Sequence, residues 1–344
     1  MAQINVSFAL SARQWDEYVR SRPAASGYHL SSWAKVFKKA FGHETRYLSA
    51  QVDGEIVGIL PLVIFKTPFL RRFAVSLPFV NYGGVVADSP EAERALVEAA
   101  ITETRDAGGQ YLELRHTLRR FPSFPCKQHK VAMILPLAET EEKQWAALDR
   151  KIRNQVRKAE KSQLRATHGG VELVDAFYDV FAHNMRDLGT PVYGKAWFHE
   201  ILSTFPEAAR VFCVWLGDQP VAASYVFAHG EMMEVPSASS LRAFNPLCAN
   251  TLLYWEMLKY AVQRGFRNFD FGRSTPGAGT YDFKRQWGAQ PHELNWEYWL
   301  ASGDDELPDM SPQNPRVQWA IEVWRHLPVP VTRAVGPLVV RNIP

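Results

Sequence analysis

YLSAQVDGEIVGIL (residues 47–60) and VFCVWLGDQPVAAS (residues 211–224) follow one pattern, in which an alternating apolar run meets a tight polar turn and a second apolar run follows. Asp53-Gly54 and Gly217-Asp218 form the turns, and such dipeptides close β-hairpins because they tolerate positive φ. The two turns lie 164 residues apart. Each segment therefore predicts an antiparallel hairpin, and together they indicate an internal repeat.

The repeat extends on both sides of the hairpins. A helical segment containing Trp33 precedes the first hairpin, and a similar one containing Trp197 precedes the second, again 164 residues later. After each hairpin come a strand-like run, a long helical pattern introduced by Ser89-Pro90 or Asn245-Pro246, and a further strand. The repeating unit is too long for a solenoid, so we predict two domains of one fold.

The order helix, hairpin, strand, helix, strand packs helices on a mixed sheet. We therefore predict an α/β (α+β mixed) fold of two tandem domains, each a mixed, largely antiparallel sheet flanked by helices. The predicted boundaries are residues 1–145 and 146–300, followed by a tail, 301–344, that packs back on the first domain. Because the tail carries Trp and several apolar residues, contact with a membrane surface is its alternative role.

Composition excludes several classes of protein. The net charge of +3 over 344 residues is too small for a dedicated nucleic-acid coat protein. The three cysteines form no CxxC pair and the histidines no HExxH pattern, so no metal site is expected. The first 18 residues lack a basic region followed by an apolar core, so export by a standard signal peptide is not expected. No stretch approaches the roughly 20 apolar residues that a membrane helix needs. We expect a cytoplasmic protein, with the inner face of the membrane as an alternative location.

Three motifs narrow the fold: LPFVNYGGVVAD (77–88), KIRNQVRKAEKSQL (151–164) and NFDFGRSTPGAGTYDFKRQWGAQP (268–291). In this order, and over about residues 25–300, they resemble the FemAB family of the GNAT acyltransferase superfamily. The similarity is greatest to FemAB-like proteins associated with exosortase and PEP-CTERM systems. The resemblance implies two tandem GNAT-like domains, a fold in which two neighbouring strands splay apart to admit the acyl donor.

The same resemblance implies a function. FemAB relatives transfer an amino acid from aminoacyl-tRNA to an amine of a peptidoglycan precursor, and other GNAT relatives use acyl-CoA. An acyltransferase or aminoacyltransferase acting on an amine of a cell-envelope or exopolysaccharide precursor is therefore expected, with no tightly bound cofactor. Two alternatives stay open: an acyl-CoA-dependent N- or O-acyltransferase acting on a sugar, and a non-catalytic GNAT pair that binds a precursor. Residues 242–250 lack a glycine-rich pyrophosphate cradle, which disfavours coenzyme A in the second half.

Direct acyl transfer needs a deprotonated nucleophile close to the donor carbonyl and a group that stabilises the oxyanion. Lys284 is the predicted catalytic cation, because a lysine in the matching Phe-Lys motif of FemAB relatives is tied to transfer; a solvated helix lysine is the alternative. Asp270 is predicted to orient or deprotonate the amine, or else to cap the loop after its strand. Arg273 is predicted to pair with Asp270 or to hold a phosphate or carboxylate. Tyr281 is a further substrate-binding candidate in the same segment.

Residues 150–165 hold seven Arg or Lys and one Glu. At helical spacing one face is basic and another is apolar. The basic face is predicted to bind phosphates of tRNA, a nucleotide sugar or a lipid pyrophosphate, through Arg150, Arg153, Arg157 and Lys161. A solvated helix at the domain junction is the alternative.

The resemblance also implies residues that contact the substrates. In FemAB relatives the matching segments form the acceptor cleft or face the substrate. The candidates are Trp33, Lys38, Asn81, Tyr82 and Arg115 in the first half, and Tyr193 and Lys195 in the second. For Trp33, packing in the core is the alternative.

Overall fold

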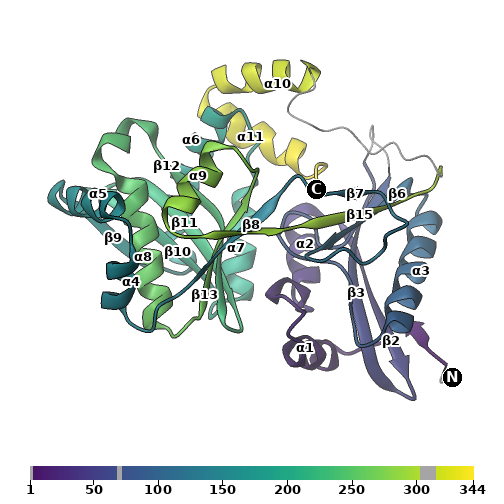
Figure 1. Cartoon of the computed structure of the whole chain (residues 1–344). Helices are drawn as coiled ribbons and strands as arrows, with labels where there is room; N and C mark the ends of the chain where they lie inside the picture. The colour runs from purple at the N-terminus through teal and green to yellow at the C-terminus, as the bar shows by residue number, and fades with distance from the viewer. Residues whose placement is uncertain (1–2, 68–71, 303–314) are drawn as a thin grey trace. The chain divides into compact units, whose positions relative to one another are not determined.

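The computed structural model describes residues 3–67, 72–302 and 315–344 (Figure 1). These residues form two compact units. Unit 1 holds residues 3–130 and 293–302 of the described chain, and unit 2 holds residues 131–292 and 315–343.

Unit 1 is built on a mixed sheet in the strand order β1-β2-β3-β4-β6-β15-β7, with β5 paired to β3. Its pairs are antiparallel except for β4 and β6, which are parallel. The elements are β1 (Asn5–Ser7), α1 (Ala12–Ser21), η1 (Gly27–His29), α2 (Trp33–Phe41), β2 (Glu44–Val52), β3 (Glu55–Phe65), β4 (Phe73–Val75), β5 (Val86–Ala87), α3 (Pro90–Asp106), β6 (Tyr111–His116), β7 (Cys126–Lys127) and β15 (Asn295–Leu300).

Unit 2 has a sheet in the order β14-β8-β13-β12-β11-β10-β9, in which β12 and β13 are the parallel pair. The strands are β8 (Val131–Pro136), β9 (Leu164–Gly169), β10 (Ala209–Leu216), β11 (Gln219–His229), β12 (Met232–Ser240), β13 (Asn268–Ser274) and β14 (Gln290–Glu293). The helices are α4 (Glu141–Ala147), α5 (Arg150–Lys161), η2 (Val171–Leu173), α6 (Val174–Leu188), α7 (Lys195–Thr204), η3 (Arg242–Leu247), α8 (Ala249–Gln263), α9 (Gly279–Gln286), α10 (Pro315–His326) and α11 (Val329–Val340).

The two sheets repeat one arrangement, as the sequence predicts. The hairpin β2–β3 corresponds to β10–β11, and the parallel pair β4–β6 corresponds to β12–β13. In both units a long helix, α3 or α8, joins the two parallel strands. Asp53 and Gly54 have φ of 51° and 86° in the first hairpin turn, which is the mirror-image turn that their sequence predicts.

Two strands join the sheet of the other unit from the one that precedes them in the chain. β8 follows the strands of unit 1 along the chain but pairs with β13, whereas β15 follows the strands of unit 2 but pairs with β6 and β7. The units therefore divide after Lys130 and again after His292, whereas the sequence predicts boundaries at 145/146 and 300/301. The apolar pattern of a strand shows that the strand is paired, but it does not identify the partner.

Unit 2 carries helices on both faces of its sheet. Val226 of β11 packs in the core cluster that includes α5 and α8, while its neighbour Tyr225 contacts Phe177 of α6 and Phe198 of α7. Because successive side chains of a strand point to opposite faces, α8 and α6 cover opposite sides.

The C-terminal helices α10 and α11 pack on α6 in unit 2, which differs from the predicted packing on the first domain. Glycines permit this close approach: a Cβ at Gly189 would lie 2.5 Å from Ile321 Cγ2, and one at Gly336 would lie 2.8 Å from Val192 Cγ1. Helical periodicity predicts that a helix buries one face, but not the surface that it covers.

Candidate active site

The parallel strands β12 and β13 diverge within unit 2. They pair over three residues each, and the last pair is Glu234 with Asp270. Beyond this pair β12 continues beside β11, while β13 continues beside β8. The pairing register of both strands shifts where they diverge. In β12 the shift lies between Glu234 and Ser237, which pair with Phe227 and Tyr225 of β11. In β13 it lies between Asp270 and Arg273. Bulges of this kind bend strands and redirect side chains, so the strands form a fork just after the two carboxylates.

Glu234 and Asp270 lie on one face of the sheet at this fork. Residues opposite one another in neighbouring strands project to the same side, and these two are only 4% and 0% exposed. Phe269 and Phe271 pack in the core under α8, so Asp270 between them projects to the other face. Asp270 Oδ1 accepts the N–H of Gly272 at 2.8 Å. Gly272 has φ of 76°, a conformation that favours glycine.

Lys284 reaches the fork from α9. It is 8% exposed, and its Nζ donates to the carbonyl oxygens of Gly272 and Arg273 at 3.0 and 2.9 Å. Burial lowers the pKa of Lys284 to about 8. The negative charges of Asp270 and Glu234 raise this pKa, whereas the positive charge of Arg273 lowers it further. The two carbonyls accept two of the three N–H groups of the ammonium, which leaves the third for a ligand.

Aromatic packing holds α9 in place. The ring of Phe283 lies 5.1 Å from that of Tyr254 on α8, and Trp287 lies 6.2 Å from Phe271, measured between centroids. Tyr281 packs against the same core, with the Arg285 guanidinium 6.0 Å from its ring centroid. The sequence around Lys284 thus supplies both the charge and the apolar anchors that fix its position.

Two groups near this site were not selected from the sequence. Glu234 stands in the apolar run Met232–Pro236, and a lone acid in such a strand is the signal that would have identified it. Ser274, next to Arg273, is buried, and its Oγ has no hydrogen-bond partner among the residues that the structure describes. A buried hydroxyl without a partner is unusual in a folded protein.

The basic helix has the two faces that its sequence predicts. Ile152, Val156 and Ala159 are buried in the cluster with α8, whereas Arg150, Arg157 and Lys161 are exposed and Arg153 is half-buried. A shallow hollow of about 540 Å³ lies at the start of α5. Its lining has three cations and one carboxylate: Asp149, Arg150, Lys151, Asn154, Gln155 and Lys158. The hollow suits an anion, and it lies on the α8 side of the sheet, opposite to the side that Asp270 faces.

Unit 1 contains a related but altered fork. β4 and β6 end their pairing at Val75 and Glu113, so Glu113 occupies the register position of Asp270, and Val75 that of Glu234. Buried Arg115 donates from Nε to Glu113 at 2.6 Å and from Nη1 to the Val80 carbonyl at 3.3 Å. An ion pair therefore fills the place where unit 2 has two carboxylates and a lysine. The backbone of the Asn81-Tyr82 turn adjoins it, since the Gly83 N–H donates to the Arg115 carbonyl at 3.1 Å.

The other predicted substrate residues lie in varied surroundings. Trp33 is fully buried and donates from Nε1 to the Gly27 carbonyl at 3.0 Å, which is the environment of a core residue, while Lys38 on the same helix is exposed. Tyr193 stacks on Phe181, and exposed Lys195 forms an ion pair with Asp175 at 2.8 Å.

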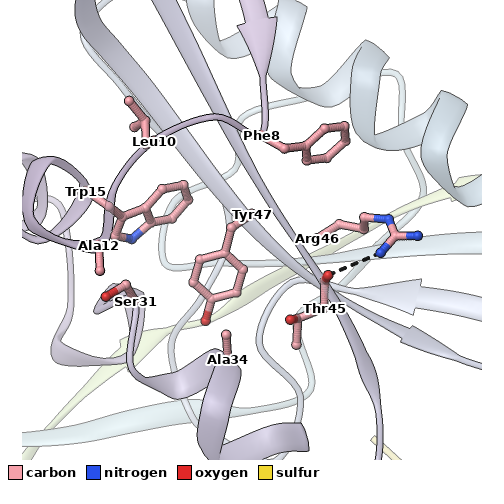
Figure 2. A pocket seen from close by; sticks show the side chains of 9 residues that line it. All are labelled: Phe8, Leu10, Ala12, Trp15, Ser31, Ala34, Thr45, Arg46 and Tyr47. Atoms are coloured by element: carbon pink, nitrogen blue, oxygen red, sulfur yellow. Dashed lines mark hydrogen bonds between the residues drawn. The ribbon is translucent and has the colours of Figure 1, made fainter.

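Unit 1 also has a hollow of about 470 Å³, shown in Figure 2. It is lined by Phe8, Leu10, Ala12, Trp15, Ser31, Ala34, Thr45, Arg46 and Tyr47, none of which was predicted to bind a substrate. The Tyr47 hydroxyl points toward Ser31 and Ala34, and it lies close to the backbone of Ala34. Burial raises the pKa of Tyr47 above its ordinary value. Its lining is mainly apolar and aromatic, with Arg46 as the charged residue.

In the described part of the chain no cluster of three or more His, Cys, Asp or Glu residues is arranged to hold a metal ion. Over the same ranges, no helix combines the length and the apolar character needed to span a membrane.

One protein family matches part of the chain. Residues 146–285 match the family described as acetyltransferase (GNAT) domain. No curated protein matches the chain in sequence.

Three solved structures have a similar fold. The crystal structure of FemX is 17% identical, with 87% of this chain and 98% of that chain covered and a TM-score of 0.70. A tandem GNAT protein from the clavulanic acid biosynthesis pathway is 12% identical, with 89% and 100% covered and a TM-score of 0.54. The C-terminal domain of a protein assigned as a lysylphosphatidylglycerol synthetase from Agrobacterium fabrum is 11% identical, with 85% and 92% covered and a TM-score of 0.57. The predicted tandem GNAT-like fold is confirmed.

Proposed function

We propose that this chain, whose two units share the GNAT fold, transfers an acyl or aminoacyl group to an amine, with unit 2 as the catalytic unit. One observation carries the proposal: the fork between β12 and β13 brings together buried Lys284, Asp270 and Glu234. A buried cation of lowered pKa beside two acids is a common arrangement for proton transfer and charge stabilisation.

In the proposed reaction the deprotonated amine of the acceptor attacks the donor's carbonyl carbon within the fork. A C–N bond forms, and the bond from the carbonyl carbon to the ribose oxygen or to the thioester sulfur of the donor breaks. The proton of the amine passes to the carboxylate of Asp270 or Glu234 and from there to the departing oxygen or sulfur, which leaves as the alcohol or thiol. The Lys284 ammonium stabilises the negative charge that develops on the carbonyl oxygen or on the leaving atom.

The favoured donor is aminoacyl-tRNA. The exposed cations of α5, which include Arg150 and Arg157, offer a surface for phosphates. The segment before α8 lacks consecutive glycines and contains Pro246, so few backbone N–H groups are available to cradle a pyrophosphate. Acyl-CoA is the second candidate, because the matched family is described as an acetyltransferase domain.

The favoured acceptor is an amine on a cell-envelope or exopolysaccharide precursor. This choice rests on the resemblance of residues 77–88, 151–164 and 268–291 to FemAB-like proteins, including those associated with exosortase and PEP-CTERM systems. Aminoacyl transfer is also the chemistry to which the name lysylphosphatidylglycerol synthetase refers for one structural neighbour.

The donor is tested by measuring the binding of charged tRNA, uncharged tRNA and acetyl-CoA at low and physiological salt. Purely electrostatic binding to tRNA weakens steeply with salt, so a preference for charged tRNA that survives at physiological salt identifies the donor. Preferred binding of acetyl-CoA would assign the same scaffold to acyl-CoA. If neither donor bound, the non-catalytic GNAT pair would replace the proposed transferase.

The role of Lys284 is tested with the donor so identified. Lys284→Ala is expected to reduce transfer by about 100-fold or more, since it removes a preorganised charge at the reacting centre. Lys143→Ala, on the exposed surface of α4, is the matched control and should retain wild-type transfer. Circular dichroism checks that both variants fold. Equal activity of the two variants would contradict the site.

A further inference from the structure

The C-terminal helix α11 rests on a short connecting segment within unit 2. This segment, residues 189–194, joins α6 to α7 and carries Tyr193, one of the predicted substrate residues. A Cβ at Gly336 of α11 would lie 2.8 Å from the backbone nitrogen of buried Val192 and 2.9 Å from its oxygen. Backbone atoms cannot move aside as the tip of a side chain can, so glycine permits this contact. The backbone of α11 is therefore in direct contact with the connecting segment.

A second contact joins α11 to the same segment through α6. The Tyr178 hydroxyl on α6 donates to the Tyr193 carbonyl at 3.0 Å. Arg333 of α11 lies over the Tyr178 ring, with 5.5 Å between the guanidinium carbon and the ring centroid, and it pairs with Asp179 at 2.7 Å. Tyr178 thus contacts α11 through its ring and the connecting segment through its hydroxyl. Two separate contacts fix the backbone of the segment that carries Tyr193.

The Tyr193 ring belongs to an aromatic cluster that reaches the sheet of unit 2. It lies 6.4 Å from Phe181 with nearly parallel planes, and 6.3 Å from Phe198, both measured between ring centroids. The ring of Phe198 lies 5.4 Å from that of Tyr225 on β11. A single ring therefore bridges Tyr193 and Tyr225. Because packed side chains transmit displacements, a shift of the connecting segment would be felt at the sheet.

Tyr225 lies on the face of the sheet that carries the two carboxylates. Phe227 pairs with Glu234 of β12, and Tyr225 stands two residues before Phe227 on β11, so all three project to one side. Burial raises the pKa of Tyr225, and the charge of Glu234 and the phenol of Tyr193 raise it further. Electrostatic effects of both groups on one hydroxyl indicate that both lie near it. The Tyr193 ring is therefore close to the fork.

We propose that α11 is a positioning element of the active site, which holds the Tyr193 ring beside Tyr225 and Glu234 at the fork. The inference rests on the proposed function of unit 2 and adds Gly336 and Tyr178 to it as positioning residues. Both act through the backbone of the connecting segment. A group that contacts a substrate must be held to within about 0.5 Å of its productive position, and a misplacement of about 1 Å can cost about 100-fold in rate. Small changes at either positioning residue should therefore slow transfer.

The position of Tyr193 is tested by fluorine NMR of the full chain, with fluorotyrosine incorporated at this position alone. Gly336→Ala is expected to displace the resonance, because the added Cβ meets the Val192 backbone while alanine favours the helix more than glycine does. Tyr178→Phe, which removes only the hydroxyl, is expected to displace it as well. Leu338→Ala, on the exposed surface of α11, is the matched control and should leave the resonance unchanged. Circular dichroism and thermal unfolding check that all variants fold.

Transfer is then measured with the donor found in the binding comparison, charged tRNA or acetyl-CoA. Gly336→Ala and Tyr178→Phe should each lower kcat by about tenfold or more, because the Tyr193 ring is displaced. The decline of kcat that follows the pKa of Lys284 should remain near pH 8, since neither change alters that lysine.

Three results would overturn the proposal: an unchanged resonance in both variants, an equal displacement in Leu338→Ala, or wild-type transfer by Gly336→Ala and Tyr178→Phe. If the wild-type chain transfers nothing, the proposed function fails, while the resonances still decide whether α11 positions Tyr193. Failure of the proposed function and failure of the positioning role are therefore distinguishable.

Discussion

At the scale of single residues, the chemistry of the site depends on the electrostatic balance around Lys284. Burial lowers its pKa to about 8, and Asp270 and Glu234 prevent a larger decrease, while Arg273 acts in the opposite direction. The two carbonyl acceptors, on Gly272 and Arg273, favour the charged form as well. A lysine so placed is mostly an ammonium at pH 7 and loses its proton slightly above that pH.

This balance predicts the pH dependence of transfer. If the ammonium is the active form, the transfer rate should decline as the pH rises through about 8. Asp270→Asn and Glu234→Gln each remove a negative charge that raises the pKa of Lys284, so in both variants the decline should begin at lower pH. The shift to lower pH should be larger for Asp270→Asn, because Asp270 has the larger effect on this pKa. In Lys284→Arg any remaining activity should not decline there, because arginine stays charged. The measurement is kcat against pH, and an identical decline in all four proteins would contradict the assignment.

At the scale of elements, the decisive strand of unit 2 is β8. It lies before α4 in the sequence, yet it pairs with β13, the strand that carries Asp270. Val131 and Met133 of β8 are buried in the same core cluster as Phe271. A strand without its neighbour exposes unpaired backbone groups and apolar side chains.

We therefore expect the solubility and stability of a unit 2 fragment to depend on whether it contains β8. A fragment of residues 131–292 should give soluble, folded protein, whereas a fragment of residues 146–292 should aggregate or unfold, because β13 then becomes an edge strand over an incomplete core. Soluble yield and urea unfolding followed by circular dichroism measure the difference. Equal stability of the two fragments would show that β8 is dispensable.

At the scale of the whole molecule, unit 1 is completed by a strand that follows unit 2 in the chain. Glu297 on β15 is fully buried and accepts from His116 Nδ1 at 2.7 Å and from the N–H groups of Arg120 and Phe121 at 3.0 and 2.6 Å. Burial raises the pKa of Glu297, but the hydrogen bonds from His116, Arg120 and Phe121 outweigh it and bring the pKa below its ordinary value. Unit 1 thus reaches its full structure only when β15, which follows the strands of unit 2 in the chain, pairs with β6 and β7.

Glu297→Gln is expected to lower the free energy of unfolding of unit 1 at pH 7 by about 3 kcal/mol, since it removes one partner of a buried hydrogen-bonded network. A carboxyl group of lowered pKa stabilises the fold above its ordinary pKa and loses that effect as the pH falls through the lower folded-state value. The difference between variant and wild type should therefore shrink below about pH 4. Urea unfolding at pH 7 and at a pH below about 4 measures this difference in the free energy of unfolding. Glu98→Gln, at an exposed position, is the control. A difference that is the same at both pH values would rule out the charged network.

The sequence by itself determined the repeat, the hairpin turns, the two faces of α5 and the position of Lys284 and Asp270 on neighbouring elements, because local periodicity and turn chemistry depend on adjacent residues. The pairing of β8 with β13, the docking of α10 and α11 on α6, and the arrival of Glu234 beside Asp270 were decided only by the tertiary structure. These contacts join residues far apart in the chain, and an apolar strand or helix face is compatible with more than one partner. The site could therefore be predicted as far as its lysine and one acid, whereas the second acid required the register of two strands.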